Sequence, residues 1–280
     1  MKIIEWNINH RAGQRAGQMV GAMPEWVSEY IQEKHADIVV LTEVSFRIPN
    51  LEEQMKNMFN MSEYNVFHSF NTQNSQNDLI IAIKKESFDF ISRQSFSSSA
   101  GKYPDNLIVS CIHKETGKKI MVVGVRIHAL HGLSDNNKKR EEFKNILDYL
   151  KDKDNVIIVG DFNNYRCGYH DPNHIWDLEN VKSLGNSYNY RMYTPEGGSI
   201  YCDHYSDKAQ YFPEDHIFLK GQMKVTKTLY DRDFVNKDKM IYKWGKDFQG
   251  QFDGRKSPKI NPPYPDHALL ECELSIDALI

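Results

Sequence analysis

The chain has 280 residues, four cysteines and a formal net charge of −3. A chain of this length can bury a large core, and β-rich folds reach this size as one domain. The weak negative charge argues against a generally basic nucleic-acid binder, and no apolar run approaches the roughly 20 residues that cross a bilayer. We therefore expect a single domain over residues 1–280 with no membrane span.

The first predicted elements are strands separated by a helix. Lys2–Asn9 has the composition of a strand, and Pro24 fits the first turn of a helix that runs to about His35. Asp37–Glu43 is a continuous apolar run that ends in a carboxylate, which is typical of a central, fully buried strand. The pattern predicts that this part of the chain builds the interior of a sheet.

The rest of the chain repeats this alternation. Leu107–His113 and Lys119–Ile127 are predicted to pair as a hairpin, and a helix is predicted over about Asn137–Lys151. Two further apolar segments, Asn155–Val159 and Glu214–Leu219, are predicted strands, as is the run that begins after His267 near the C-terminus. Strands that alternate with helices and hairpins indicate mixed sheets covered by helices.

The cysteines and the N-terminus bear on the compartment. Cys111, Cys167, Cys202 and Cys272 lack the Cys-x-x-Cys spacing of a metal site, so we expect reduced thiols of an intracellular protein. Residue 2 already belongs to a predicted strand, with no basic and then apolar leader before it. These features predict a cytoplasmic protein.

The most informative segment is the predicted strand that ends in Gly160-Asp161-Phe162-Asn163. Glycine allows a tight turn at the strand end, after which the carboxylate of Asp161 and the amide of Asn163 can face one cleft. A carboxylate offers an oxygen ligand to a hard cation, and an amide offers a hydrogen-bond donor to a phosphate. The same residues would also suit an ordinary Asx turn.

Matching polar groups stand at several other predicted strand ends. They are carboxylates, amides and imidazoles spread over the whole chain: Asn7, Asn9, Glu43, His128, Asp215, Asp266 and His267. Singly, each has a structural explanation, because a Glu after a strand is usually solvated and a His there usually caps the strand. Together, such groups on several strands can converge at one edge of a sandwich.

This ordered set resembles the exonuclease/endonuclease/phosphatase superfamily, which has the fold of pancreatic-type deoxyribonuclease. The resemblance covers Asn7 to His267 and depends most on the Gly-Asp-Phe-Asn motif and on Asp266-His267 before the last strand. It implies an α/β four-layer sandwich, in which helices flank two mixed β-sheets. Thr42 and Pro265 depart from the family pattern, which often has Gln and Ser at those positions.

The resemblance also implies roles for these residues in phosphoester hydrolysis. His267 would take a proton from the attacking water and Asp215 would hold the imidazole. Asp161 would orient the water or protonate the leaving oxygen, while Asn163 and His128 would donate hydrogen bonds to the phosphate. His131 is the alternative to His128, and the Asp215-His216 pair imitates the Asp266-His267 pair.

The metal ligands follow from the same resemblance. Glu43 would be the main ligand, with Asn7 and Asp266 beside it or bound through water. Ligands that are all oxygen atoms suit Mg²⁺ or Mn²⁺ rather than Zn²⁺.

The substrate is suggested by a basic segment between the last two motifs. Residues 220–259 hold eleven lysines and arginines against five aspartates, and they also contain six aromatic residues. We interpret about 220–260 as an insertion in which Lys243, Lys246, Arg255 and Trp244 contact a nucleic acid through its phosphates and bases. A solvated insertion with a small satellite core is the alternative.

Two functions from different classes remain open at this stage. The first is a metal-dependent nuclease, with DNA favoured over RNA as its substrate. The alternative is a phosphatase or phosphodiesterase that acts on a small or lipid-linked phosphate and uses the basic segment as a lid. A catalytically inactive binding module fits less well, because the motif set is nearly complete.

Overall fold

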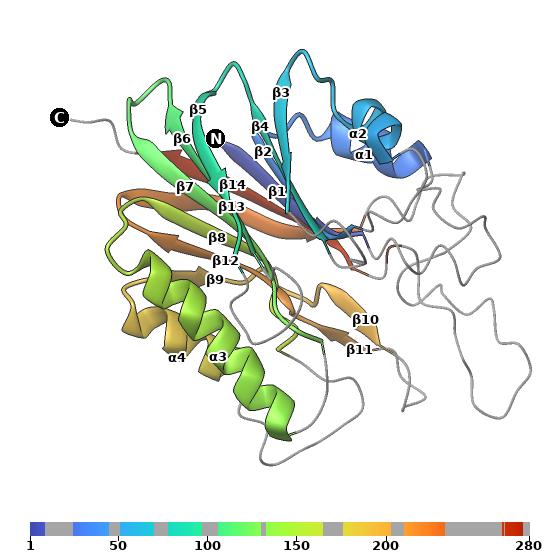
Figure 1. Ribbon diagram of the computed structural model, residues 1–280. Helices are drawn as coiled ribbons and strands as arrows, with labels where there is room; N and C mark the ends of the chain where they lie inside the picture. The colour runs from blue at the N-terminus through green and yellow to red at the C-terminus, as the bar shows by residue number, and fades with distance from the viewer. Residues whose placement is uncertain are drawn as a thin grey trace, which may run out of the picture.

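The computed structural model contains two mixed, six-stranded β-sheets that pack face to face (Figure 1). It describes these parts of the chain: residues 1–8, 25–44, 51–69, 78–96, 106–129, 133–164, 176–202, 210–232, 265 and 267–276. The sheets form the two inner layers of the molecule, and helices lie on their outer faces.

The first sheet has the strand order β13-β14-β1-β2-β4-β3. Its two central strands, β1 and β2, run parallel, and each is flanked by an antiparallel neighbour. The strands span Lys2–Asn7 (β1), Ile38–Val44 (β2), Tyr64–His68 (β3), Asp78–Lys84 (β4), Met223–Asp231 (β13) and Leu269–Ile276 (β14).

The second sheet has the order β5-β6-β7-β8-β12-β9 and repeats this arrangement around the parallel pair β7 and β8. Its strands span Phe88–Gln94 (β5), Asn106–His113 (β6), Lys119–Arg126 (β7), Val156–Asp161 (β8), Arg191–Tyr193 (β9) and Asp215–Lys220 (β12). A separate two-stranded sheet consists of β10 (Ile200–Cys202) and β11 (Gln210–Phe212).

Four helices of the described chain complete the outer layers. Helices α1 (Glu25–Glu33) and α2 (Leu51–Met58) lie beside the first sheet, and α3 (Leu133–Leu150) and α4 (Leu178–Ser187) cover the second (Figure 1). Where helix α1 contacts the first sheet, the ring centroids of Tyr30 on α1 and Trp6 on β1 are 5.8 Å apart. The predicted four-layer α/β sandwich is therefore confirmed.

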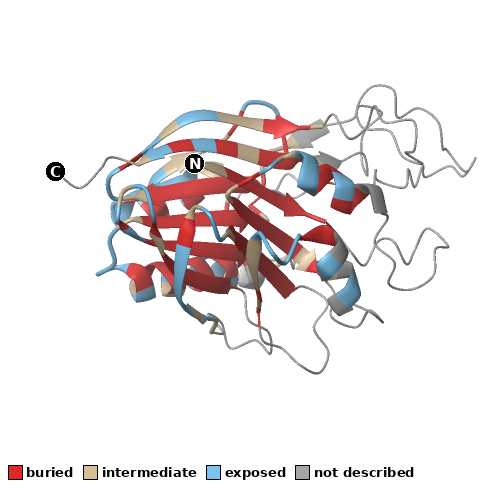
Figure 2. Cartoon of the chain, turned by 90° about the horizontal axis from the view of Figure 1, so that it is seen from above, coloured by how far each residue is buried: buried red, intermediate tan, exposed pale blue. Residues whose placement is uncertain are grey.

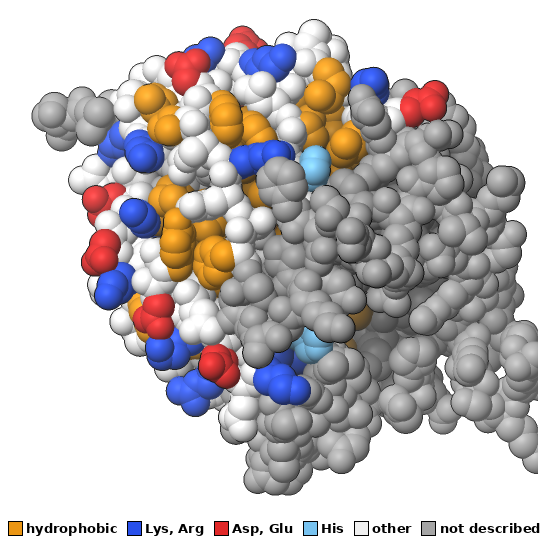
Figure 3. Space-filling model, in the orientation of Figure 1, with side chains coloured by type: hydrophobic (Ala, Val, Ile, Leu, Met, Phe, Trp, Pro, Cys, Tyr) orange, Lys and Arg blue, Asp and Glu red, His pale blue; other side chains and the backbone are white. Residues whose placement is uncertain are grey.

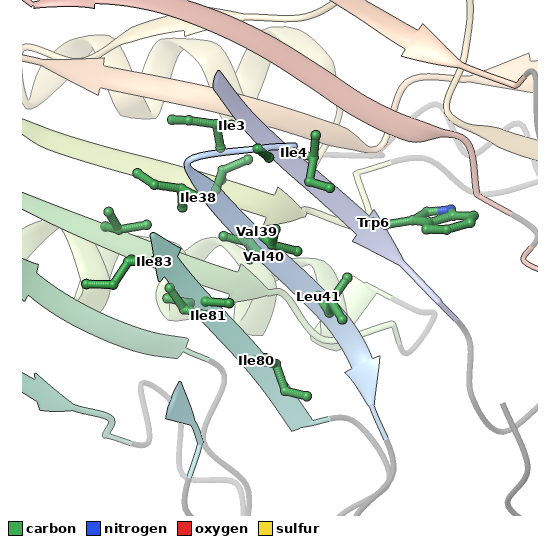
Figure 4. Packing of buried hydrophobic residues seen from close by; sticks show 14 of the residues in the cluster. Ile3, Ile4, Trp6, Ile38, Val39, Val40, Leu41, Ile80, Ile81 and Ile83 are labelled. Atoms are coloured by element: carbon green, nitrogen blue, oxygen red, sulfur yellow. The ribbon is translucent and has the colours of Figure 1, made fainter. Parts of the chain in front are cut away.

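The core between the layers is formed by branched aliphatic side chains from the central strands. Ile38, Val39, Val40 and Leu41 of β2 are all buried, which explains the continuous apolar run in the sequence (Figure 4). The central strands are buried along most of their length, while exposed residues gather on the helices and outer strands (Figure 2). Apolar burial of this extent is the main force that holds the layers together.

The predicted elements agree with the structure except near their ends. Helix α1 stops at Glu33, where residues 34 and 35 form a turn, and α3 begins at Leu133, four residues before the predicted start. The described beginning of the basic segment contains the end of β12 and the strand β13, and the rest of the predicted insertion lies outside the described residues. No helix in the described ranges is long and apolar enough to cross a membrane.

Candidate active site

The polar strand ends of both sheets meet at one edge of the sandwich. Asn7 pairs with Thr42 in the parallel β1–β2 ladder, and Glu43 is the residue after Thr42. Asn7 and Glu43 therefore reach the same edge. In the second sheet, Asp161 lies opposite Arg126 on β7 and opposite Asp215 on β12. Hydrogen bonds between the sheets then join the two sets of side chains.

His267 and Asp215 form a buried pair at this edge. The Nδ1 atom of His267 lies 2.7 Å from Oδ2 of Asp215, and the two residues are 4% and 0% exposed. The other ring nitrogen, Nε2, lies 3.5 Å from Nδ2 of Asn7. A carboxylate on Nδ1 fixes the proton there and leaves Nε2 to act as a proton acceptor.

Three residues that the sequence did not single out hold this pair through its backbone. The hydroxyl of Ser199 accepts hydrogen bonds from the N–H groups of Glu214 and Asp215, at 2.9 and 3.1 Å. The indole of Trp6 donates to the His267 carbonyl at 2.8 Å, and the hydroxyl of Tyr230 donates to the Asp215 carbonyl at 2.5 Å. The order of the motifs gives no signal for these contacts, because they depend on packing between distant strands.

Asp161 receives three hydrogen bonds in the centre of the site. Asn163 donates to it from its backbone N–H and from Nδ2, both at 2.8 Å, and Asn7 donates from Nδ2 at 3.0 Å. Burial raises the pKa of Asp161 to about 7; the charge of His267 opposes this shift and that of Asp215 adds to it. This carboxyl group can therefore exchange a proton near neutral pH.

The glycine before Asp161 is required by close packing against the neighbouring strand. A Cβ atom at Gly160 would lie 1.9 Å from the Val125 carbonyl oxygen of β7. Asn163 then adopts a positive φ of 45°, a conformation that Asn tolerates better than most residues. The Gly-Asp-Phe-Asn motif thus turns the chain sharply at the end of β8.

Side chains of helix α3 form hydrogen bonds with the loops that follow β7 and β8. The ammonium group of Lys139 donates to the Asn163 carbonyl at 2.9 Å, and Glu142 accepts from the backbone N–H of His128 at 2.9 Å. His128 is half-buried and follows the end of β7 by two residues, rather than ending the strand as predicted. Two charged residues on one helix therefore fix the positions of Asn163 and His128.

Glu43 reaches the site from a distorted part of β2. The pairing of β2 with β4 shifts register between Leu41 and Val44, and Glu43 has a φ of 54°. Its Oε1 atom accepts hydrogen bonds from Nε and Nη2 of Arg126, at 2.9 and 2.6 Å. Burial alone would raise the pKa of Glu43. The charge and hydrogen bonds of Arg126 outweigh this effect, so the pKa of this carboxyl group is lowered.

The predicted metal ligands are only partly within the described chain. Glu43 and Asn7 contribute carboxylate and amide groups to one region, and such hard oxygen donors suit Mg²⁺ or Mn²⁺. Asp266 lies outside the described residues. Within the described ranges, no group of three or more His, Cys, Asp or Glu residues is arranged to hold a metal ion.

His216 lies next to Asp215 in sequence but is bonded on both sides. Its Nε2 atom lies 2.9 Å from Oδ1 of Asn164, and its Nδ1 atom lies 3.0 Å from the hydroxyl of Thr194. Burial lowers the pKa of His216 to about 3, so the ring is neutral at neutral pH. The contacts of His216 differ from those of His267, which faces Asp215 and Asn7.

The predicted substrate contacts lie elsewhere in the chain. Lys243, Trp244, Lys246 and Arg255 are outside the described residues, so their prediction remains untested.

A comparison with protein families matches residues 4–245 to the model of the Endonuclease/Exonuclease/phosphatase family. The chain belongs to this family. Members of the family hydrolyse phosphoester bonds and generally use divalent metal ions. No curated protein matches the chain significantly.

Solved structures share the fold of this family member at low sequence identity. Danio rerio TDP2, in complex with a single-strand DNA product, is 13% identical with a TM-score of 0.61, covering 98% of each chain. An endonuclease/exonuclease/phosphatase from Bacteroides vulgatus is 14% identical with a TM-score of 0.64, covering 99% of this chain and 98% of its own. A mannosyl-6-phosphatase from Bacteroides thetaiotaomicron is 13% identical with a TM-score of 0.58, covering 99% of this chain and 100% of its own.

Proposed function

We propose that this chain is a divalent-metal-dependent nuclease that cleaves phosphodiester bonds, with DNA as its favoured substrate. The observation that carries the hydrolytic part of the proposal is the buried contact of 2.7 Å between His267 and Asp215. It stands at an edge where amide and carboxylate groups of both sheets meet, which is the arrangement that activation of a water molecule requires.

His267 acts as the general base of this reaction. With the Nδ1 proton held by Asp215, the Nε2 lone pair accepts a proton from the water that attacks phosphorus. The Asp215 carboxylate then stabilises the imidazolium that forms. Removal of either partner leaves the other with the wrong charge or the wrong orientation.

Asp161, Asn163 and His128 serve the phosphate and the leaving group. Asp161, which accepts three hydrogen bonds in the centre of the site, orients the water or protonates the leaving oxygen. His128 donates a hydrogen bond to a phosphoryl oxygen, and Asn163 does so by exchanging one of the two bonds that its Nδ2 group makes here, to Asp161 and to the Ile127 carbonyl. The loops that carry both residues are held by Lys139 and Glu142 of helix α3.

Glu43 and Asn7 would hold the divalent cation, together with Asp266. When bound, Mg²⁺ or Mn²⁺ would neutralise negative charge on the phosphoryl oxygens. The oxygen-only donor chemistry of these residues fits either ion.

The choice of a nucleic acid rests on two observations beyond the site. Danio rerio TDP2 has a similar fold and is complexed with single-strand DNA. The basic and aromatic residues of the 220–259 segment have the composition of a surface that follows phosphates and stacks on bases. Because of this composition, the proposal assigns substrate binding to Lys243, Trp244, Lys246 and Arg255. On the described face of Figure 3, acidic and basic side chains are interspersed.

A phosphatase that acts on a small ester is the second candidate, since the mannosyl-6-phosphatase also has a similar fold. The test incubates the full chain with supercoiled plasmid and, separately, with a panel of phosphomonoesters, with Mg²⁺ or with EDTA. We expect Mg²⁺-dependent nicking that is lost in His267→Ala, the control for contaminating nucleases. Phosphate release without nicking would favour the phosphatase, and no hydrolysis of any substrate would contradict both functions.

A further inference from the structure

Arg126 occupies a position in the active-site edge that the proposed mechanism does not use. It is the last residue of β7, lies opposite Asp161 in the β7–β8 ladder and is 8% exposed. Its guanidinium group crosses to the other sheet and contacts Glu43, the main predicted metal ligand. The positive charge therefore lies where the proposed function requires a cation.

The contact between Arg126 and Glu43 has the features of a strong ion pair. Two N–H groups of the guanidinium donate to one carboxylate oxygen, Oε1, at 2.9 and 2.6 Å. The two side chains are 9% and 15% exposed, so water screens the pair only weakly. Charge-assisted bonds of this kind are stronger than neutral ones, and loss of one partner leaves a poorly solvated charge.

The backbone of β2 directs Glu43 toward this contact. The irregular pairing between Leu41 and Val44, together with the φ of 54° at Glu43, departs from regular strand geometry. Local irregularities of this type re-aim a side chain, and they persist where surrounding contacts hold them in place. The bond with Arg126 is such a contact.

We propose that Arg126 and a divalent cation are alternative partners of Glu43. In the structure, the guanidinium pairs with the carboxylate and holds it at the active-site edge. Glu43 would exchange the guanidinium for a bound cation, so the free energy of breaking the ion pair would reduce the net free energy of metal binding. Arg126 is thus a positioning residue that weakens the apparent metal affinity.

This inference rests on the metal-binding part of the proposed function but not on the substrate. It is tested by calorimetric titration of MnCl₂ into the EDTA-stripped and dialysed full chain, without any substrate. We expect Arg126→Met to bind Mn²⁺ at least about tenfold more tightly than the parent, and Glu43→Gln to lose this binding. Arg126→Lys, which keeps a charge without the planar fork, should fall between Arg126→Met and the parent.

Arg191→Met is the matched control for loss of an arginine. Arg191 donates to the Met223 carbonyl at 2.6 Å and has no contact with Glu43, so this variant should bind Mn²⁺ as the parent does. An unchanged or weaker affinity in Arg126→Met, or no binding by any variant, would overturn the inference. If Arg126→Met does not fold, the Mn²⁺ affinity of Arg126→Lys decides instead. Tighter binding than in the parent would support the inference, and equal or weaker binding would overturn it. Failure of the proposed nuclease would instead appear in the plasmid assay while the titration still showed the tenfold gain.

Discussion

Two groups of buried or half-buried charges in this molecule differ in how completely their charges are balanced. The first, which we call the helix anchor, joins helix α1 to the first sheet through Lys2, Tyr30, Lys34, Asp231 and Glu271. Its two ammonium groups face two carboxylates. Lys34 contacts both Asp231 and Glu271, and the Tyr30 hydroxyl donates to Asp231 at 2.6 Å.

The second group, the cleft cluster, consists of Glu5, Glu43, Arg126, Asp161, Asp215 and His267. Here four carboxyl groups face one guanidinium and one imidazole. Oε2 of Glu5 and Oδ1 of Asp215 are buried without a hydrogen-bond partner in the described structure. Burial, together with the charges of Asp215 and Asp161, raises the pKa of Glu5 well above its usual range.

The helix anchor has the charge balance of a structural group, and the cleft cluster is the group to which we assign function. In the helix anchor each charge has its partner, so the group stabilises the fold and has little capacity for a ligand. The cleft cluster has more carboxyl groups than cationic partners, which is costly in a buried region unless protons or a cation supply the missing positive charge. Perturbed pKa values gathered in this way are typical of catalytic sites.

The largest effect on function is expected from the cleft cluster. His267→Ala removes the proton acceptor and should lower kcat by about 10³-fold, equivalent to about 4 kcal/mol in the activation barrier. Steady-state hydrolysis of the substrate identified in the plasmid and phosphomonoester assays measures this loss. A variant that retained most of the activity would contradict the assignment of His267 as the base.

A substitution in the helix anchor should lower the stability of the fold and leave catalysis unchanged. Lys34→Met removes a cation that bonds two carboxylates and should lower the free energy of unfolding by about 3–5 kcal/mol. Urea denaturation measures the change, and Lys144→Met, at an exposed pair on α3, is the control that should leave the midpoint unchanged. Specific activity of the folded Lys34→Met protein should equal that of the parent; a large loss would remove the distinction between the two groups.

The third prediction concerns the histidine that is adjacent to the cleft cluster but is not part of it. The pKa of His216 is about 3 in the folded protein and about 6.5 when unfolded, so the unfolded state binds more protons between these values. Stability should therefore fall as the pH is lowered below about 6.5, by about 3 kcal/mol at pH 4. In His216→Gln this contribution should be missing. An identical pH dependence of unfolding in both proteins would show that His216 is not the group responsible.

The smallest expected effect concerns the support of the catalytic pair. Trp6→Phe keeps the ring beside Tyr30 but loses the bond from the indole to the His267 carbonyl. Stability should decrease by about 1 kcal/mol, and kcat should fall by less than tenfold with KM nearly unchanged. A loss as large as that of His267→Ala would make Trp6 part of the chemistry, which its position behind His267 does not support.

The sequence predicted which groups of the candidate site lie together, because these groups stand at strand ends. Asn7, Asp161, Asp215 and His267 each follow or precede an apolar run, and the two parallel strand pairs bring such ends to a common edge. The fold itself was predicted from the resemblance carried by these same motifs. Periodicity alone indicates mixed sheets with helices but does not fix the order of the strands.

Arg126 was missed because its importance depends on a contact between sheets. In the sequence it is one polar residue at the end of an apolar strand, and nothing nearby indicates a bond to Glu43. Ser199 and Tyr230 were missed for the same reason, since they act on backbone atoms of distant strands. Such contacts follow from three-dimensional packing, for which one sequence gives no local signal.

Two helices were missed for local reasons. Helix α2 has only eight residues and is largely polar, so only a few apolar residues indicate a helix there. Helix α4 has an N-cap at Asp177, but it contains Gly185, which usually disfavours a helix. The glycine is explained by packing, because a Cβ atom there would lie 2.3 Å from the ring of Phe218.

We propose that His267 and Asp215 act as one unit in phosphoester hydrolysis. A double-mutant cycle of His267→Ala and Asp215→Asn, measured as kcat/KM with saturating Mg²⁺, shows whether the two side chains are coupled. We predict that Asp215→Asn is the milder single change and that the double variant is barely worse than His267→Ala. Independent losses that add in free energy would contradict the account, because they would mean that the two side chains do not work as a pair.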